Sequence, residues 1–202
     1  MTVRPYDPSD LDDLVEVCIG TADNGSDATG LLDDDLLWAE LYLLPYLERH
    51  PDLAFVVEDD RGRAHGYIVA TDDTDAFEAW FRDEWWPPRR AAYAASRDQN
   101  QADLVASADS RAPGVWAHEG THPAHLHIDL LPDAQGKGWG TTLISYLAVA
   151  LGHRGVPGVH AVASAENVGA AAFYPKAGFE ELTAPQGSRA FGLDLQRDPA
   201  ST

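Results

Sequence analysis

The fold is decided by one stretch of sequence, Leu130-Leu131-Pro132-Asp133-Ala134-Gln135-Gly136-Lys137-Gly138-Trp139-Gly140-Thr141-Thr142-Leu143. An apolar, strand-like run ends at a proline, a short loop with three alternate glycines follows, and an apolar helical pattern then begins. Glycines at the start of a helix let backbone N–H groups approach an anion, and the helix dipole favours negative charge there. The stretch therefore predicts a loop that holds a diphosphate.

Two other phosphate-binding loops are excluded by the spacing of this stretch. A P-loop needs a hydroxyl residue directly after its lysine, but Gly138 follows Lys137. A dinucleotide-binding fingerprint needs the spacing G-x-G-x-x-G, whereas these glycines alternate strictly. An ordinary glycine-rich turn is the remaining alternative.

Composition favours one soluble protein with a large core. The chain has 202 residues, of which 45% are hydrophobic. No apolar run approaches the ~18 residues that span a bilayer, no signal peptide is recognisable at the start, and the single Cys18 excludes an internal disulfide. We therefore expect a cytoplasmic protein.

The charge of the chain bears on its partners. The formal net charge is −19, with 33 acidic and 14 basic residues. Such a surface repels nucleic acid and anionic membranes and attracts cationic or amine-bearing substrates. Acidity that serves only solubility is an equal alternative. The two lysines, Lys137 and Lys176, both fall in the segments that we assign to the cofactor.

Hydrophobic periodicity predicts the elements before the glycine loop. We expect strands over 3–6, 53–58 and 66–70, with a hairpin turn at 59–62. Helices are expected over 9–20 and 33–49, the second disturbed at Pro45, and 21–30 is a polar loop. Residues 72–123 form an insertion with helices over 74–85 and 89–96 and an irregular remainder over 97–123. Its aromatic residues line a pocket or pack against the sheet or a second subunit: Trp80, Trp85, Trp86 and Tyr93.

The second half alternates strands with helices, which argues for an α/β layer. Strands are expected over 126–131, 159–163 and 188–195, and helices over 138–152 and 167–179, with Gly178 as the residue that ends the last helix. Because the insertion is too sparse in branched apolar residues to carry its own core, we expect one domain over residues 1–202.

A second motif, Asn167…Phe173-Tyr174-Pro175-Lys176-Ala177-Gly178-Phe179, lies one helix and one strand after the glycine loop. Together with Gln135-Gly136-Lys137-Gly138-Trp139-Gly140 it resembles the signature of the GNAT family of N-acetyltransferases, and the resemblance covers about residues 120–195 well. It implies an α/β (α+β) fold. The central sheet would be mixed, mostly antiparallel and twisted, with a splayed parallel strand pair, helices on both faces and a helical insert between the third and fourth strands.

The resemblance also implies that acetyl-CoA is the cosubstrate and that no metal is needed. Main-chain groups of Ile128, Leu130 and Leu131 would contact pantetheine and the acetyl carbonyl. The pyrophosphate would be surrounded by Gln135, Gly136, Lys137, Gly138, Trp139, Gly140 and Thr141. Asn167 would reach the pantetheine arm, Phe173 the adenine side, and Lys176 completes the cofactor set. Tyr174 would protonate the leaving thiolate; an ordinary amphipathic aromatic at a helix end is the alternative.

The general base is chosen from the strand before the loop. Asp129 and His127 alternate with apolar Ile128 and Leu130, so both point off the same face. A carboxylate there can act as a base or anchor the substrate amine, and a hydrogen-bonded surface aspartate is as good an interpretation. His127 supports Asp129 or takes the proton itself.

Two further groups have open interpretations. His118, His122, His125 and His127 cluster in the sequence, but hydrogen bonding explains them better than a metal site. The acidic loop 21–30 resembles, together with the 126–129 strand, the acetyltransferase-like C-terminal domain of O-GlcNAcase and its bacterial relatives. Asp23 and Asp27 would bind the acceptor, or the loop is a solvated turn.

These observations predict an acetyl-CoA-dependent N-acetyltransferase that acts on a small-molecule amine or a lysine-bearing acceptor, with a homodimer expected from family habit. The alternative is a catalytically inactive acetyl-CoA-binding module that works through dimerisation. A nucleotide-binding domain of other chemistry is a third and weaker option.

Overall fold

Seven strands form one mixed sheet in the order β1-β2-β3-β4-β5-β7-β6. The structure is a computed structural model and describes residues 1–115 and 120–196. Among the strands of these described residues, only β4 and β5 pair in parallel, and the other neighbours are antiparallel. This confirms the expected mixed, mostly antiparallel sheet with one parallel pair. The strands are β1 (Thr2–Pro5), β2 (Phe55–Glu58), β3 (Ala64–Thr71), β4 (Ala124–Leu130), β5 (Gly158–Ser164), β6 (Glu180–Leu182) and β7 (Ser188–Asp194).

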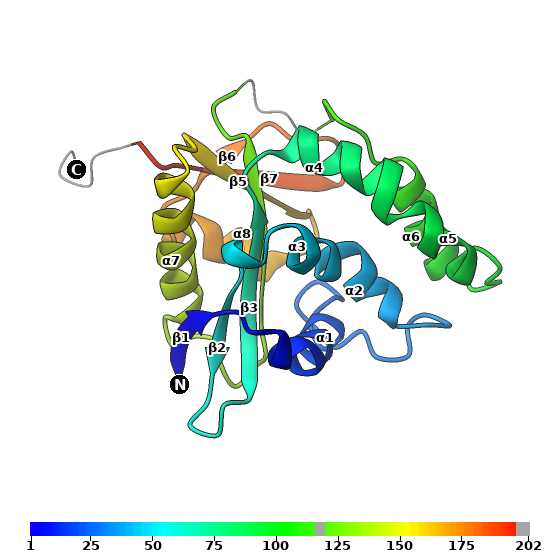
Figure 1. Ribbon diagram of the computed structural model, residues 1–202, viewed down its shortest axis with the longest axis horizontal. Coiled ribbons are helices and arrows are strands. Elements are labelled where there is room, and N and C mark those ends of the chain that lie inside the picture. The colour runs from blue at the N-terminus through cyan, green and yellow to red at the C-terminus, as the bar shows by residue number, and fades with distance from the viewer. Residues whose placement is uncertain (116–119, 197–202) are drawn as a thin grey trace.

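Helices cover both faces of the sheet, as expected (Figure 1). On one face α7 and α8 enclose a core with the inward side chains of β2 to β5 and β7. On the other face α1 to α6 build a second core against β2 and β3. The helices are α1 (Leu11–Ile19), α2 (Leu36–Tyr42), α3 (Leu44–Arg49), α4 (Thr74–Trp80), α5 (Pro87–Tyr93), α6 (Gln99–Asp109), α7 (Trp139–His153) and α8 (Val168–Lys176).

The helix expected over 33–49 is two helices that meet at Leu43, where φ is −129°. Pro45 is the cause, because proline has no N–H to donate to the carbonyl four residues earlier, that of Leu41. The Leu41 carbonyl instead accepts a hydrogen bond from Nη1 of Arg111, at 3.2 Å. The break in the helix thus provides an anchor for a residue of the insertion.

The insertion between β3 and β4 contains more helix than its sequence predicts. After α4 the chain makes a π-helical turn, Phe81–Trp85, and then forms α5. The prediction of an irregular remainder was wrong over α6, whose first turn is capped by Asp98. The helix has few branched apolar residues, so its sequence shows no clear apolar stripe. Its Val105 and Ala108 are buried by contacts with other elements of the fold.

The aromatic residues of the insertion pack into the core on the α1 side of the sheet. Trp85, Trp86 and Tyr93 are buried there, and Trp80 is partly buried against them. Of the three interpretations offered by the sequence, packing on the sheet side is the one the structure shows.

The short strand β6 was missed by the sequence analysis. Gly178 follows α8 with φ of +92°, as expected of the residue that ends a helix. The chain then turns back at once, and β6 pairs with β7 through Glu180, Glu181 and Leu182. Two glutamates in a run of three residues give no strand pattern.

β4 and β5 separate soon after they pair. Only Ala124 with Val159 and His125 with His160 are partners in the ladder. Beyond His125, the side of β4 that faces β5 pairs with no strand in the described parts of the chain, while its other side stays paired with β3 as far as Leu130. A gap lined by backbone groups therefore opens between two central strands.

Gly66 in β3 fixes how closely β3 approaches the open end of β4. A Cβ atom at this position would lie 2.8 Å from the carbonyl oxygen of Asp129 and 2.3 Å from Cδ2 of Leu130. We expect Gly66→Ala to destabilise the protein by about 1–3 kcal/mol, because backbone must move to admit the methyl group.

The matched control is Gly152→Ala in α7. No atom lies within 4 Å of a Cβ there, so the methyl group should stabilise the helix by about 0.5–1 kcal/mol. Urea unfolding of both variants measures the difference, and an unchanged midpoint for Gly66→Ala would contradict the close approach.

Candidate active site

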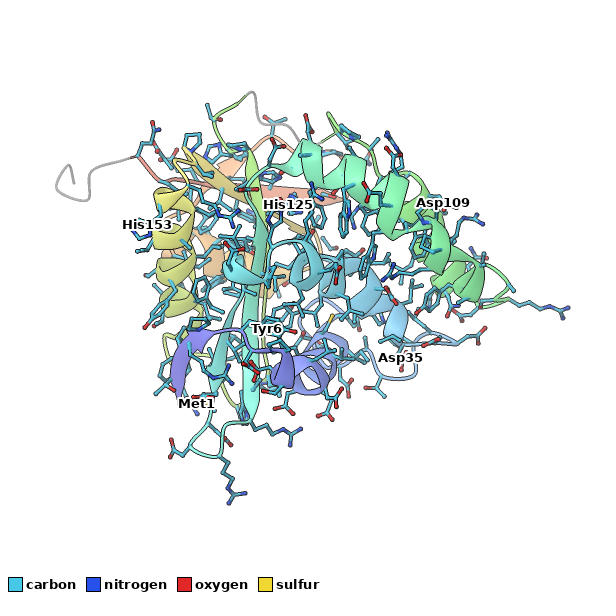
Figure 2. The ribbon with its side chains drawn as sticks, in the orientation of Figure 1. Met1, Tyr6, Asp35, Asp109, His125 and His153 are labelled. Carbon is cyan, nitrogen blue, oxygen red and sulfur yellow. The ribbon has the colours of Figure 1, made fainter. Side chains whose placement is uncertain are left out.

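The gap between β4 and β5 is part of a continuous cavity of about 1100 Å³. We name its two ends by their walls. The glycine-loop half is walled by α8 and by Gln135, Gly136, Gly138, Gly140 and Thr141. The insert half is walled by the loop after α1, by α2 and α3, and by α4 and α6 with Arg111. Between them lie three side chains of one face of β4, the β4 polar row: His125, His127 and Asp129. His125 lies in the interior of the molecule (Figure 2).

The glycine loop presents a run of free backbone donors. Gly136 and Gly138 have φ of +69° and +86°, conformations that suit glycine. None of the N–H groups from Gln135 to Thr141 donates a hydrogen bond to the part of the chain that the structure describes. They surround the N-terminus of α7, a helix of 15 residues, so dipole and donors together favour an anion.

The side chains of this loop are already engaged. Gln135 donates from Nε2 to the Leu130 carbonyl at 2.8 Å, and Lys137 donates from Nζ to the Asp133 carbonyl at 2.7 Å. Gly140 is required for packing, since a Cβ there would lie 2.9 Å from the ring of Phe173. The cradle is thus formed by main chain, with side chains that brace it.

Most of the residues expected around a cofactor line the cavity. They are Ile128, Leu130, Gln135, Gly136, Gly138, Gly140, Thr141, Asn167, Phe173 and Lys176. Leu131, Lys137 and Trp139 do not line it, and the Leu131 N–H donates to the His65 carbonyl at 2.9 Å. Asn167 has a second role: its Oδ1 accepts from the Ala170 N–H at 2.8 Å and caps α8.

Asp129 lies in the cavity wall among hydroxyl groups. Burial raises its pKa, and the hydroxyls of Tyr67 and Thr21 beside it act in the opposite direction. Tyr67 is its partner across the β3–β4 ladder, and the Tyr67 hydroxyl has no hydrogen bond of good geometry with the described residues. A carboxylate of raised pKa is a stronger base than an exposed one.

His127 has the opposite character. Burial, with the charge of Arg111 and the proximity of His160, lowers its pKa to about 3. Its Nε2 lies 3.0 Å from the hydroxyl of Tyr46, a residue that the sequence did not single out. The imidazole is therefore neutral at physiological pH and binds protons weakly.

Tyr174 faces the same part of the cavity from α8. Its ring stacks on Phe191 with 4.9 Å between centroids, and its hydroxyl makes no hydrogen bond with the described residues. Burial raises the pKa of this phenol, and the charge of Asp129 adds to the rise. Tyr174 thus keeps its proton at neutral pH and has it available for a ligand.

The insert half contains an ion pair that the sequence analysis missed. Nε and Nη2 of Arg111 donate to the two carboxylate oxygens of Glu78 at 2.8 and 2.6 Å, and the guanidinium lies 3.7 Å from the centroid of the Phe81 ring. The only sequence signal was a glutamate beside the apolar stripe of α4. Of the two expected acceptor residues, Asp23 lines the cavity and Asp27 does not; Asp27 accepts from the Thr29 N–H and hydroxyl.

Among residues 1–115 and 120–196, no group of three or more His, Cys, Asp or Glu side chains is placed to hold a metal ion. His118 of the sequence cluster lies outside the described residues. The described helices include none that is long and apolar enough to cross a membrane.

Comparison with known proteins identifies the fold. The chain is 35% identical to SsHAT, and the crystal structure of SsHAT superposes with a TM-score of 0.87 over 97% of this chain and 98% of that one. The family profile described as "Acetyltransferase (GNAT) domain" matches residues 99–181. The chain belongs to the GNAT acetyltransferase family.

More distant structures share the fold. The Salmonella typhimurium protein yncA, solved with its cofactor acetyl-CoA, is 16% identical with a TM-score of 0.57, over 100% of this chain and 98% of that one. Chaetomium thermophilum Naa20, solved with a bisubstrate analogue, is 19% identical with a TM-score of 0.52, over 95% and 84%. This chain is an acetyltransferase of a family that uses acetyl-CoA, and the free donors of its glycine loop fit a pyrophosphate.

Gly138→Glu should remove binding of acetyl-CoA, because it places bulk and negative charge among the donors of the glycine loop. A ligand at 100 times its Kd stabilises the folded state by about 2.7 kcal/mol, and we expect the variant to lose most of this gain. Thermal unfolding with and without acetyl-CoA measures it.

Gly62→Glu is the matched control for that experiment. Gly62 lies in the β2–β3 turn with φ of +82° and open space around its Cβ position, so the added charge and backbone strain are alike. If acetyl-CoA stabilises both variants equally against thermal unfolding, the glycine loop does not bind the pyrophosphate.

Asp129→Asn should stabilise the protein in a pH-dependent way. The folded-state pKa is raised, so ionisation costs stability once the pH passes the unfolded value, and the cost is complete above the folded value. At pH 7 the free energy of unfolding of the variant should rise by about 1.4 kcal/mol for each unit by which burial raises the pKa of Asp129. Below the ordinary pKa range of an aspartate it should gain nothing.

Asp60→Asn serves as the control, because the Asp60 side chain is fully exposed. It makes the same change in net charge without burial and should alter stability by less than about 0.5 kcal/mol. Unfolding measured from pH 3.5 to 7 compares the two. A gain for Asp129→Asn that is constant with pH would show that burial does not raise this pKa.

Proposed function

We propose that this protein is an acetyl-CoA-dependent N-acetyltransferase that transfers the acetyl group directly to an amine. The observation that supports this most strongly is the meeting, in one cavity, of a donor-rich glycine loop with Asp129 and Tyr174. The whole chain, 1–202, would act as one domain in which residues 72–123 form a wall of the acceptor site.

Bound acetyl-CoA supplies a thioester, whose carbonyl carbon is the electrophile. The acceptor first loses its ammonium proton to solvent, so that its nitrogen has a lone pair. Asp129 accepts a second proton of this nitrogen as the carbon–nitrogen bond forms, and Tyr174 donates its phenolic proton to the sulfur as the carbon–sulfur bond breaks. Solvent then returns the proton from Asp129 to Tyr174, so the products are an amide and a free thiol.

Asp129 is preferred to His127 as the base because their environments differ. Burial makes the carboxylate a better proton acceptor, whereas it leaves the imidazole with a pKa of about 3. An imidazole of this kind remains a good hydrogen-bond acceptor, and we place it beside the acceptor nitrogen.

The acceptor would enter through the insert half. Asp23 and Glu78 line this half, and the formal charge of the chain is −19. Both favour a cationic acceptor such as a small amine or a lysine side chain. Glu78 is neutralised by Arg111. Asp23 accepts from the Asn24 side chain at 3.3 Å and has no cationic partner among the described residues, so we assign it to acceptor binding.

Three further predictions remain from the sequence. These are the kinship with the O-GlcNAcase C-terminal domain, a homodimer and a cytoplasmic location. Tyr146 and Val149, both exposed on α7, offer an apolar patch that supports self-association.

A screen of amines, aminosugars and lysine peptides for release of free CoA thiol tests the proposed function. In that assay Tyr174→Phe should lower kcat by about 100-fold while the Kd for acetyl-CoA stays the same. Tyr146→Phe is the control, because Tyr146 is exposed and does not line the cavity, and this variant should keep full activity.

Two outcomes would count against the proposal. Tight binding of acetyl-CoA with no turnover of any acceptor would favour a non-catalytic binding module. Full activity of Tyr174→Phe would remove Tyr174 from the role of acid.

A further inference from the structure

We propose that Thr74, His125 and Tyr46 are positioning residues that fix the tautomer of His127. They hold its Nδ1 lone pair ready to accept a hydrogen bond from the nitrogen of the acceptor. The inference rests on the proposed function for its acceptor, but the tautomers follow from geometry alone.

The chain of hydrogen bonds begins at a group that can only accept. The carbonyl of Pro123 lies 2.6 Å from Oγ1 of Thr74, so the Thr74 hydroxyl must donate to it. A hydroxyl has one proton, and Thr74 therefore has none left for His125. Its oxygen lies 2.9 Å from Nδ1 of His125, which must be the donor in that contact.

The donors and acceptors at His125 and Tyr46 follow in the same way. His125 is buried, and burial lowers its pKa well below the ordinary value, so the ring is neutral and Nε2 has a lone pair. Tyr46 lies 2.6 Å away and donates its hydroxyl proton to that atom. The Tyr46 oxygen can then only accept, and it receives the Nε2–H of His127 at 3.0 Å.

What remains on His127 is Nδ1, now an unprotonated acceptor. No residue in the described parts of the chain donates to it, and His127 lines the cavity beside Asp129. Alternate residues of a strand lie roughly 7 Å apart on one face. An amine between them can direct one N–H to His127 and release its proton to Asp129.

Neighbouring charges leave the order of donors unchanged. Arg111 also acts on Tyr46 through its charge. A guanidinium can only donate, so it offers no alternative acceptor for the Tyr46 proton, and Tyr46 still donates to His125. His160 lies against His125 with 5.8 Å between ring centroids, and its Nδ1 donates to the His122 carbonyl at 2.9 Å. The Pro123 carbonyl therefore sets the donor-to-acceptor direction of the hydrogen bonds from Thr74 as far as His127.

The test reads the tautomers directly, by long-range ¹H–¹⁵N correlation in labelled protein at pH 7. We expect His125 protonated at Nδ1 and His127 protonated at Nε2, with His127→Gln used to assign the signals. His127 protonated at Nδ1 would overturn the proposal. This readout needs no acceptor, so it stands even if the proposed function fails.

Thr74→Val tests whether the direction is transmitted. The variant removes the hydroxyl that fixes His125, so we expect mixed tautomers at His127, two side chains away, and a kcat lowered about tenfold. The KM for acetyl-CoA should not change. Thr74→Ser keeps the hydroxyl and should restore both the single tautomer and kcat.

Tyr46→Phe removes the link next to His127 and should produce the same mixed tautomers. Tyr93→Phe is its control, since Tyr93 is buried in α5 and does not line the cavity. An unchanged His127 tautomer in both Thr74→Val and Tyr46→Phe would overturn the proposal. Turnover by wild-type protein with full kcat in Thr74→Val would refute the positioning role while leaving the proposed function intact.

Discussion

The separation of β4 from β5 is the constraint on which the rest of the structure depends. Two residue pairs hold the strands together, and after His125 no described strand pairs with β4 on that side. Unpaired backbone groups in an interior are costly unless something satisfies them. The protein satisfies one of these groups itself, because the Gln135 side chain donates to the Leu130 carbonyl. The other unpaired backbone groups of β4 are open to a ligand.

A row of polar side chains lies beside this separation. His127 and Asp129 stand on the part of β4 that is not paired with β5, and they are partly buried in the cavity wall. Their burial moves the two groups in opposite directions, since it disfavours the charged form of each. One strand thus presents a neutral imidazole and a strengthened carboxylate to the same space.

The residues of the glycine-loop half could be predicted from the sequence much better than those of the insert half. The glycines, the alternation on β4 and the Asn167 motif are local patterns, and local patterns predict loops and strand faces. Arg111 had no such signal, because its partners come from elsewhere in the chain. Its position depends on Glu78 in α4 and on a carbonyl freed by Pro45. Tyr46 likewise looks like one more residue of an apolar helix, and its contacts with two histidines of β4 exist only in the folded chain.

The division of the cavity has a consequence for how new specificities can arise. The backbone donors of the glycine loop come from residues 135–141, whereas α4, α6 and Arg111 form the opposite wall. Arg111 and Glu78 tie that wall together from within the insertion. If the proposed function holds, selection or engineering can remodel one wall for a different acceptor, by lengthening α6 or changing Ser107 and Ala108, while the wall that we assign to the acetyl donor is inherited intact.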